Sequence, residues 1–118
     1  MTALLVAVGG ATGALARYGI GTLVSTDRLP WATVAINVTG SFLLGLLIAT
    51  GGWLSEEART GLAAGLLGGF TTFSAFSADL YFEAEAGNGR FVLVYVLVSI
   101  GLGVAAAGAG VVLGRRFA

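Results

Sequence analysis

The 118-residue sequence contains no cysteine and no histidine, and only 10% of its residues are charged. Without cysteine, the chain can form neither disulfide bonds nor thiolate metal sites. Without histidine, it lacks the commonest transition-metal ligand and the side chain that most often moves protons near neutral pH. These absences argue against hydrolytic and redox enzymes, and we expect no nucleic-acid partner.

Hydrophobic residues are abundant instead, at 57% of the chain, which is far above the balance of a soluble domain. Charged residues separate apolar segments at roughly 2–24, 31–53, 60–81 and 90–114. The predicted connections are Thr26–Pro30, Ser55–Arg59 and Glu83–Arg90, and Arg115 and Arg116 follow the last segment. The first segment lacks the basic start of a signal peptide, so we expect a retained helix. The sequence predicts an all-α membrane protein in which residues 1–118 form one domain of four transmembrane helices.

The arginines are distributed evenly between the two sides of this arrangement. Arg59, Arg115 and Arg116 lie on the side of the termini, and Arg28, Arg90 and, if it reaches the nearer interface, Arg17 lie on the other. Because basic residues favour the cytoplasmic side, this balance predicts no preferred orientation. We expect oppositely inserted copies to pair as an antiparallel homodimer in the lipid membrane, and a single orientation set by other factors is the alternative.

Glycine is abundant, with 20 copies in the chain. Many of them recur four residues apart, as in Gly9 with Gly13, Gly61 with Gly65 and Gly69, and Gly110 with Gly114. Such spacing places glycines on one helix face, where two backbones can approach closely. We therefore expect glycine to form helix interfaces.

Polar side chains inside the apolar segments are candidate functional residues, because an unpaired polar group in hydrocarbon costs several kcal/mol. Thr33, Asn37 and Ser41 share one face of the second segment, and Tyr95 and Ser99 form a shorter row in the fourth. Each row can either bond neighbouring helices together or line a wet path. Arg17 can either attract anions or anchor its helix at the interface.

The third segment contains an unusual stretch near its middle, Gly68–Phe73. Two adjacent glycines followed by two β-branched threonines weaken a helix, and carbonyl groups freed by a break could bind a cation. In an inverted dimer, both copies could contribute these oxygens. Phe73 and Phe76 follow at i, i+3, and the positive edges of their rings could attract an anion. The alternative is that these phenylalanines face lipid or fill space.

Three segments together resemble the Fluc (CrcB) fluoride-channel family: Gly9–Ile20, Trp31–Gly45 and Gly65–Ser77. The resemblance covers essentially the whole chain in size, number of spans and order of motifs. It implies a dual-topology homodimer with two fluoride pores and a structural sodium ion at its centre. It also implies passive fluoride export that reduces toxicity in the cytoplasm, in the plasma membrane of a bacterium or an archaeon.

The same resemblance implies roles for individual residues. Asn37 would offer amide hydrogens to fluoride, Phe73 and Phe76 would line the path with their ring edges, and Gly68 and Thr71 would bind sodium through backbone carbonyls. Arg17 matches an arginine near the vestibule. The remaining candidates for polar lining are Ser41, Thr72, Ser74, Tyr95 and Ser99. The sequence departs from the family at Ala75, where threonine or serine is frequent, so one hydroxyl group of the polar lining is missing.

Two other functions fit the same length and number of spans. A small multidrug exporter needs a carboxylate inside the membrane, but Asp27 lies in a connection and Asp79 near the end of the third segment. A membrane scaffold without transport activity would use the glycine faces and polar rows only for packing. We favour a channel over a pump because Arg17, which stays protonated, is the one ionisable residue well inside a span.

Overall fold

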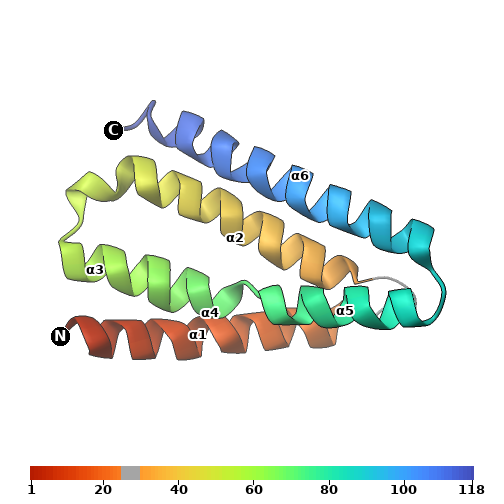
Figure 1. The fold of residues 1–118 in the computed structure, drawn as a ribbon. Helices are drawn as coiled ribbons and strands as arrows, with labels where there is room; N and C mark the ends of the chain where they lie inside the picture. Colours follow the sequence, from red (N-terminus) through yellow and green to blue (C-terminus); the bar gives the residue numbers. More distant parts are fainter. Residues whose placement is uncertain (25–29) are drawn as a thin grey trace.

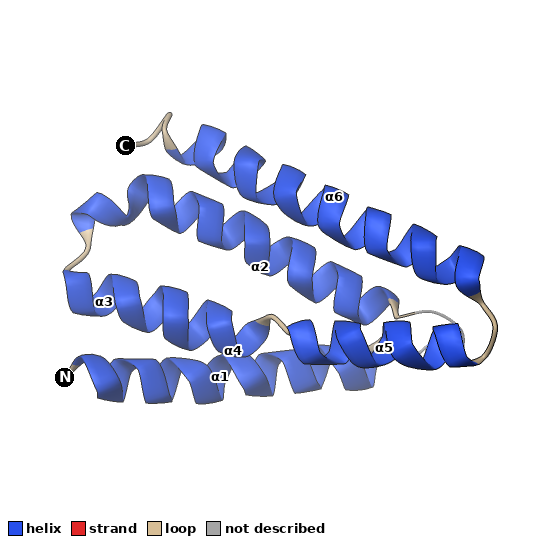
Figure 2. Cartoon of the chain, viewed as in Figure 1, coloured by secondary structure: helices blue, strands red, loops and turns tan. Residues whose placement is uncertain are grey.

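The computed structural model describes residues 1–24 and 30–118, and most of them are helical (Figures 1 and 2). The helices are α1 (Thr2–Leu23), α2 (Trp31–Thr50), η1 (Gly51–Trp53), α3 (Glu56–Thr60), η2 (Gly61–Leu67), α4 (Gly68–Phe70), α5 (Phe73–Glu85) and α6 (Gly89–Gly114). Four stretches are long and apolar enough to cross a membrane, namely Thr2–Leu23, Trp31–Trp53, Glu56–Glu85 and Gly89–Gly114. The predicted all-α membrane protein with four spans is confirmed.

The four long stretches run side by side (Figure 1). Both chain termini and the start of α3 lie at one end of the bundle, and the turn between α5 and α6 lies at the other. The α1 helix packs against η2 and α4, and α2 packs along α6. The third stretch is built from α3, η2, α4 and α5, and η2 has the wider π-helical winding.

The second connection is shorter than predicted. The sequence predicts a loop over Ser55–Arg59, but α3 begins at Glu56. The Ser55 hydroxyl accepts a hydrogen bond from the Ala58 amide at 3.2 Å, and Glu56 and Glu57 occupy the first turn, where negative charge is favourable. The charged residues that signal a connection therefore also start a helix.

The third connection is also shorter than predicted. The sequence predicts a loop over Glu83–Arg90, but α5 continues to Glu85 and α6 begins at Gly89. The turn is short because Gly87 adopts a φ of 82°, which glycine reaches without steric cost. The first predicted connection, Thr26–Pro30, lies outside the described residues except for Pro30.

Glycine determines how closely the helices approach. A side chain at Gly9 would meet the Gly61 carbonyl oxygen at 2.7 Å, and one at Gly13 would overlap the Leu66 carbonyl oxygen. On the other side of the bundle, a side chain at Gly110 would overlap the Phe42 carbonyl oxygen. The predicted glycine interfaces are confirmed, and close backbone packing is what holds helices together where lipid is as apolar as the interface.

A small cluster of buried side chains joins three helices. Val34 of α2, Phe76 of α5 and Tyr95 of α6 are each less than one-tenth exposed. Partly buried side chains surround them, namely Val38, Leu80, Phe91, Val96 and Val98. This cluster fixes the position of α5 relative to α2 and α6 and therefore positions the site described next.

Candidate functional site

The site centres on two residues that separate α4 from α5. Thr71 and Thr72 have extended backbone, with ψ of 159° at Thr71 and φ of −146° at Thr72. The Thr71 amide and hydroxyl both donate to the Leu67 carbonyl at 3.0 Å, which ends the first helical part. The Thr72 hydroxyl accepts from the Ala75 amide at 3.1 Å and caps α5. A side chain thus replaces a backbone partner at the start of α5, and at the end of α4 the Thr71 hydroxyl adds a second donor to the Leu67 carbonyl.

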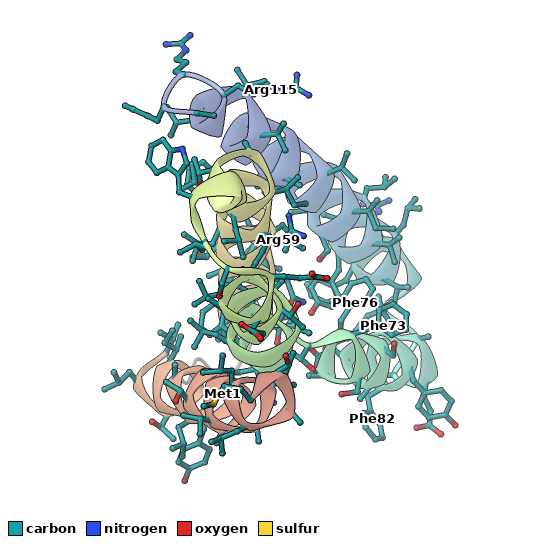
Figure 3. All side chains as sticks on the ribbon, turned by 90° about the vertical axis from the view of Figure 1, so that its left-hand side faces the viewer. Met1, Arg59, Phe73, Phe76, Phe82 and Arg115 are labelled. Carbon is teal, nitrogen blue, oxygen red and sulfur yellow. The ribbon has the colours of Figure 1, made fainter. Side chains whose placement is uncertain are left out.

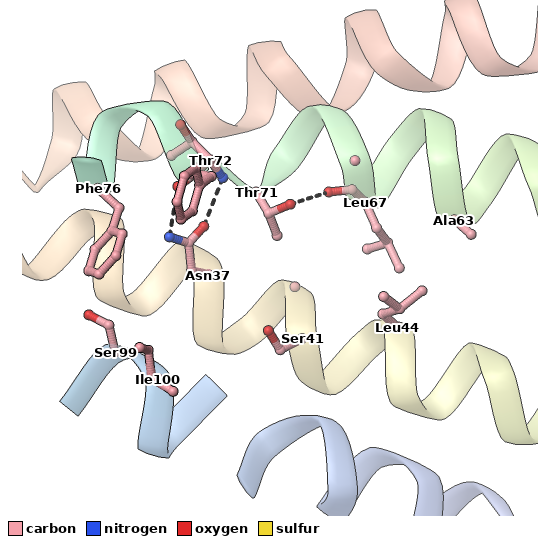
Figure 4. Close-up of a pocket in the computed structure, with 13 residues that line it drawn as sticks. Asn37, Ser41, Leu44, Ala63, Leu67, Thr71, Thr72, Phe76, Ser99 and Ile100 are labelled. Atoms are coloured by element: carbon pink, nitrogen blue, oxygen red, sulfur yellow. Dashed lines mark hydrogen bonds between the residues drawn. The ribbon is translucent and has the colours of Figure 1, made fainter. Parts of the chain in front are cut away.

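Asn37 of α2 pairs with the backbone of Thr72 (Figure 4). Its Oδ1 accepts from the Thr72 amide at 2.8 Å, and its Nδ2 donates to the Thr72 carbonyl at 3.0 Å. The side-chain amide therefore satisfies both polar groups of an extended residue, as a neighbouring strand would. One Nδ2 hydrogen remains free of this pairing.

Arg17 of α1 also contacts the interrupted region. Its Nε donates to the Gly69 carbonyl at 3.3 Å, and the residue is half-buried. In a continuous helix, the Gly69 carbonyl would accept from the amide of Phe73. The guanidinium group thus replaces a helical partner with a charged donor.

A cavity of about 370 Å³ lies between α2, the third stretch and α6 (Figure 4). Its lining consists of Asn37, Gly40, Ser41, Leu44, Ala63, Leu67, Gly68, Thr71, Thr72, Phe73, Phe76, Ser99 and Ile100. All these side chains are uncharged. The Ser99 Oγ is buried and has no hydrogen-bond partner among the described residues. A neutral cavity with an unpaired hydroxyl group suits a ligand that accepts hydrogen bonds.

Aromatic rings adjoin this cavity. The Phe73 and Phe76 ring centroids are 6.1 Å apart, and Phe76 meets Tyr95 edge-on at 5.0 Å. The Tyr95 hydroxyl donates to Asp79 Oδ2 at 3.0 Å. Phe76 is buried, whereas Phe73 is 79% exposed on the single chain. The Phe76 ring is thus held in place by its neighbours, whereas the Phe73 ring is open to contact with another molecule.

Comparison with known proteins identifies the family. Residues 4–111 match the family described as "CrcB-like protein, Camphor Resistance (CrcB)". The chain belongs to the CrcB family. Among curated CrcB relatives, a fluoride-specific ion channel FluC of Thermus thermophilus is 47% identical over 97 residues, covering 78% of each chain. The fluoride-specific ion channel FluC 1 of Symbiobacterium thermophilum is 41% identical over 121 residues, covering 97% of this chain and 98% of the relative.

The structure brings together most of the residues selected from the sequence. Eight of them line the cavity: Asn37, Ser41, Gly68, Thr71, Thr72, Phe73, Phe76 and Ser99. Three lie outside the lining: Arg17 contacts Gly69, Ser74 lies on α5 with its Oγ 3.3 Å from the Thr72 hydroxyl, and Tyr95 supports Phe76. Thr33, from the polar row of α2, lies beside the Tyr95 hydroxyl rather than in the cavity.

The sequence predicts no role in the channel for Asp79, but the structure places this residue near the site. The charge pattern puts Asp79 near the end of the third span, but α5 continues to Glu85, and Asp79 accepts the Tyr95 hydroxyl next to Phe76. The available signal was its spacing, because a residue three positions after Phe76 shares its helix face. Among the described residues, no cluster of three or more acidic side chains could hold a metal ion.

Proposed function

We propose that this chain is a fluoride-specific ion channel of the plasma membrane that lets fluoride leave the cytoplasm down its gradient. Membership of the CrcB family and the names of its curated relatives support this function. The observation on this chain that carries it is the neutral cavity in which Asn37, Ser41 and Ser99 place polar groups beside Phe76. Residues 1–118 then act as one four-helix channel domain, and the protein is not an enzyme.

Hydrogen-bond donors replace the water around the ion. Fluoride is small and strongly hydrated, so a pore must offer several donors at once and bind the ion weakly enough to release it. Asn37 retains one amide hydrogen after pairing with Thr72, and the hydroxyl groups of Ser41 and Ser99 can rotate toward the ion. Because the cavity carries no fixed positive charge, fluoride passes through it without being trapped.

Phenylalanine edges continue the path beyond the amide. Ring edges carry partial positive charge and attract an anion where a carboxylate would repel it. Phe76 is held in place by Tyr95, whose hydroxyl is in turn bonded to Asp79. Thr72 and Ser74 place further hydroxyl groups at the start of α5, beside these rings.

The channel is an antiparallel homodimer of two oppositely inserted copies in the lipid membrane. Three arginines on the side of the termini face two, Arg28 and Arg90, on the other side, and this small difference supports dual insertion. The exposure of Phe73 on the single chain supports a partner that covers it, because this ring lies at the edge of the cavity. The interrupted third helix then lies near mid-membrane, where the second copy satisfies its remaining polar groups.

The carbonyls of Gly68 and Thr71 would hold a sodium ion at the centre of this dimer. The geometry of the chain fits this assignment. The Thr72 amide, which would bond the Gly68 carbonyl in a continuous helix, donates to Asn37 instead. The Ala75 amide, which would bond the Thr71 carbonyl, donates to the Thr72 hydroxyl. Bound sodium would supply a positive charge that holds these carbonyls, one pair from each copy, together.

Fluoride release from proteoliposomes tests the proposed function. We expect the reconstituted chain to release fluoride but not chloride, with a potassium ionophore balancing charge and no proton gradient applied. Proton-driven, electroneutral release of organic cations would instead identify an exporter, in which Asp79 would be the coupling carboxylate. The absence of any flux would favour a scaffold.

A further inference from the structure

A second cavity adjoins the first. It has a volume of about 280 Å³ and lies between the end of α2 and the start of the third stretch. Its lining consists of Leu44, Leu47, Ile48, Arg59, Thr60, Ala63 and Ala64. Leu44 and Ala63 line both cavities, so the two adjoin each other along α2, and together they are called the groove below. The groove follows α2 from Ile48 to Asn37, a distance of about 16 Å at the rise of an α-helix.

Arg59 is the charged residue in the lining described for this groove. It lies in the last turn of α3, is exposed, and stands at the end of the bundle that carries both termini (Figure 3). In that view it lies on the same side of the bundle as Phe73 and Phe76. Its stem packs against Gly51, where an added Cβ would come within 2.9 Å of the Arg59 Cδ. The glycine thus leaves room for the Arg59 stem beside the end of α2.

We propose that the groove is the water-filled entrance of the fluoride path and that Arg59 attracts the anion at its mouth. The inference rests on the proposed channel function. Apolar walls of low polarisability concentrate the field of a single cation and raise the local concentration of anions. Because Arg59 stands at the mouth and not beside Asn37, it concentrates fluoride without trapping it.

Other nearby charges do not take this role. Glu56 and Glu57 lie in the first turn of α3 but outside the lining of the groove. Arg17 bonds the Gly69 carbonyl and does not line either cavity. In an inverted pair, each copy would present its Arg59 on a different side of the membrane. Each side of the membrane would therefore present one Arg59.

The test compares Arg59→Gln with wild type in fluoride efflux at low and high ionic strength, set by an impermeant salt. We expect about a three-fold lower flux at about 10 mM and near-equal flux at about 1 M, where the Debye length falls from about 30 Å to about 3 Å. Arg116→Gln removes a charge from the same end outside the groove and should leave flux unchanged.

Three outcomes overturn the inference. An Arg59→Gln channel with wild-type flux at low ionic strength shows that the charge does not act on fluoride. An equal deficit at both ionic strengths shows a structural effect instead of an electrostatic one. A wild-type chain without fluoride flux overturns the proposed function as well, so the two failures are distinguishable.

A cysteine variant allows opposite charges to be compared at position 59 in one folded preparation, so the comparison does not depend on how well the variant folds. The chain has no cysteine, so Arg59→Cys provides a single reactive thiol. A positively charged methanethiosulfonate reagent should raise flux at low ionic strength, and a negatively charged reagent should lower it in the same preparation. Equal effects of the two reagents would overturn the inference, and wild type treated with either reagent is the control.

Discussion

Replacing Asn37 with aspartate tests the proposed path where the Asn37 side chain pairs with the Thr72 backbone. The change keeps the size of the side chain and its acceptor for the Thr72 amide. It removes the Nδ2 donor, which bonds the Thr72 carbonyl at 3.0 Å, and puts a carboxylate oxygen in its place. It also introduces a negative charge into a cavity whose described lining is neutral.

The structure allows the size of the effect to be worked out. Losing a hydrogen bond and leaving the carbonyl unpaired costs about 1–3 kcal/mol. At a separation of about 5 Å and an effective dielectric constant of about 20, the new charge repels fluoride by about 3 kcal/mol. Since about 1.4 kcal/mol corresponds to a factor of ten, the repulsion alone predicts a fluoride flux at least about 100-fold lower.

The measurement is fluoride efflux from proteoliposomes at neutral pH, with equal amounts of wild type and Asn37→Asp. Asn88→Asp is the matched control, because Asn88 is exposed in the turn before α6 and lies outside both described cavities. Asn37→Leu removes both hydrogen bonds to Thr72 without adding charge, so its flux should fall between that of wild type and that of Asn37→Asp. Undiminished flux in Asn37→Asp would refute the placement of this residue in the path.

Phe73→Ile and Phe76→Ile should each strongly reduce fluoride efflux, while size-exclusion chromatography still shows an intact dimer. Only Phe76→Ile should also lower the stability against unfolding, because Phe76 is buried and Phe73 is exposed. Normal flux in both would contradict the aromatic path. Gly13→Ala should destabilise the fold by about 1–3 kcal/mol in detergent unfolding followed by circular dichroism, because its Cβ would overlap backbone, whereas Gly19→Ala meets nothing within 4 Å and should be neutral. Equal stabilities would contradict the packing of α1. Arg17→Gln removes the charged donor to Gly69 and should lower flux about ten-fold, and wild-type flux would show that this contact is dispensable.

Much of the candidate site could be selected from residue type and spacing. Hydroxyl, amide and aromatic side chains are uncommon in apolar helices, so each one is a candidate functional residue. Of these candidates, Asn37, Ser41, Phe76 and Ser99 line one cavity. Spacing alone gave Thr33 the same expected surroundings as Asn37 and Ser41. In the structure, however, Thr33 lies beside Tyr95 and not in the cavity. One helical face can meet two different surroundings along its length.

The number and approximate bounds of the spans, and the faces on which glycine packs, could be read from the residues alone. Both follow from local properties, because a span needs a minimum apolar length and close packing needs the absence of a side chain. The start of α3 and the end of α5 were less predictable, since charged residues mark a connection and a helix start equally well.

Only the tertiary structure shows which residues far apart in the sequence contact each other. Asn37 pairs with Thr72 across 35 residues, Arg17 with Gly69 across 52, and Tyr95 with Asp79 across 16. The position of Arg59 in a cavity that adjoins the Asn37 cavity also depends on this packing. A helix that is apolar on all sides carries no amphipathic pattern to indicate its rotation or its neighbours, so these partners depend on packing between helices.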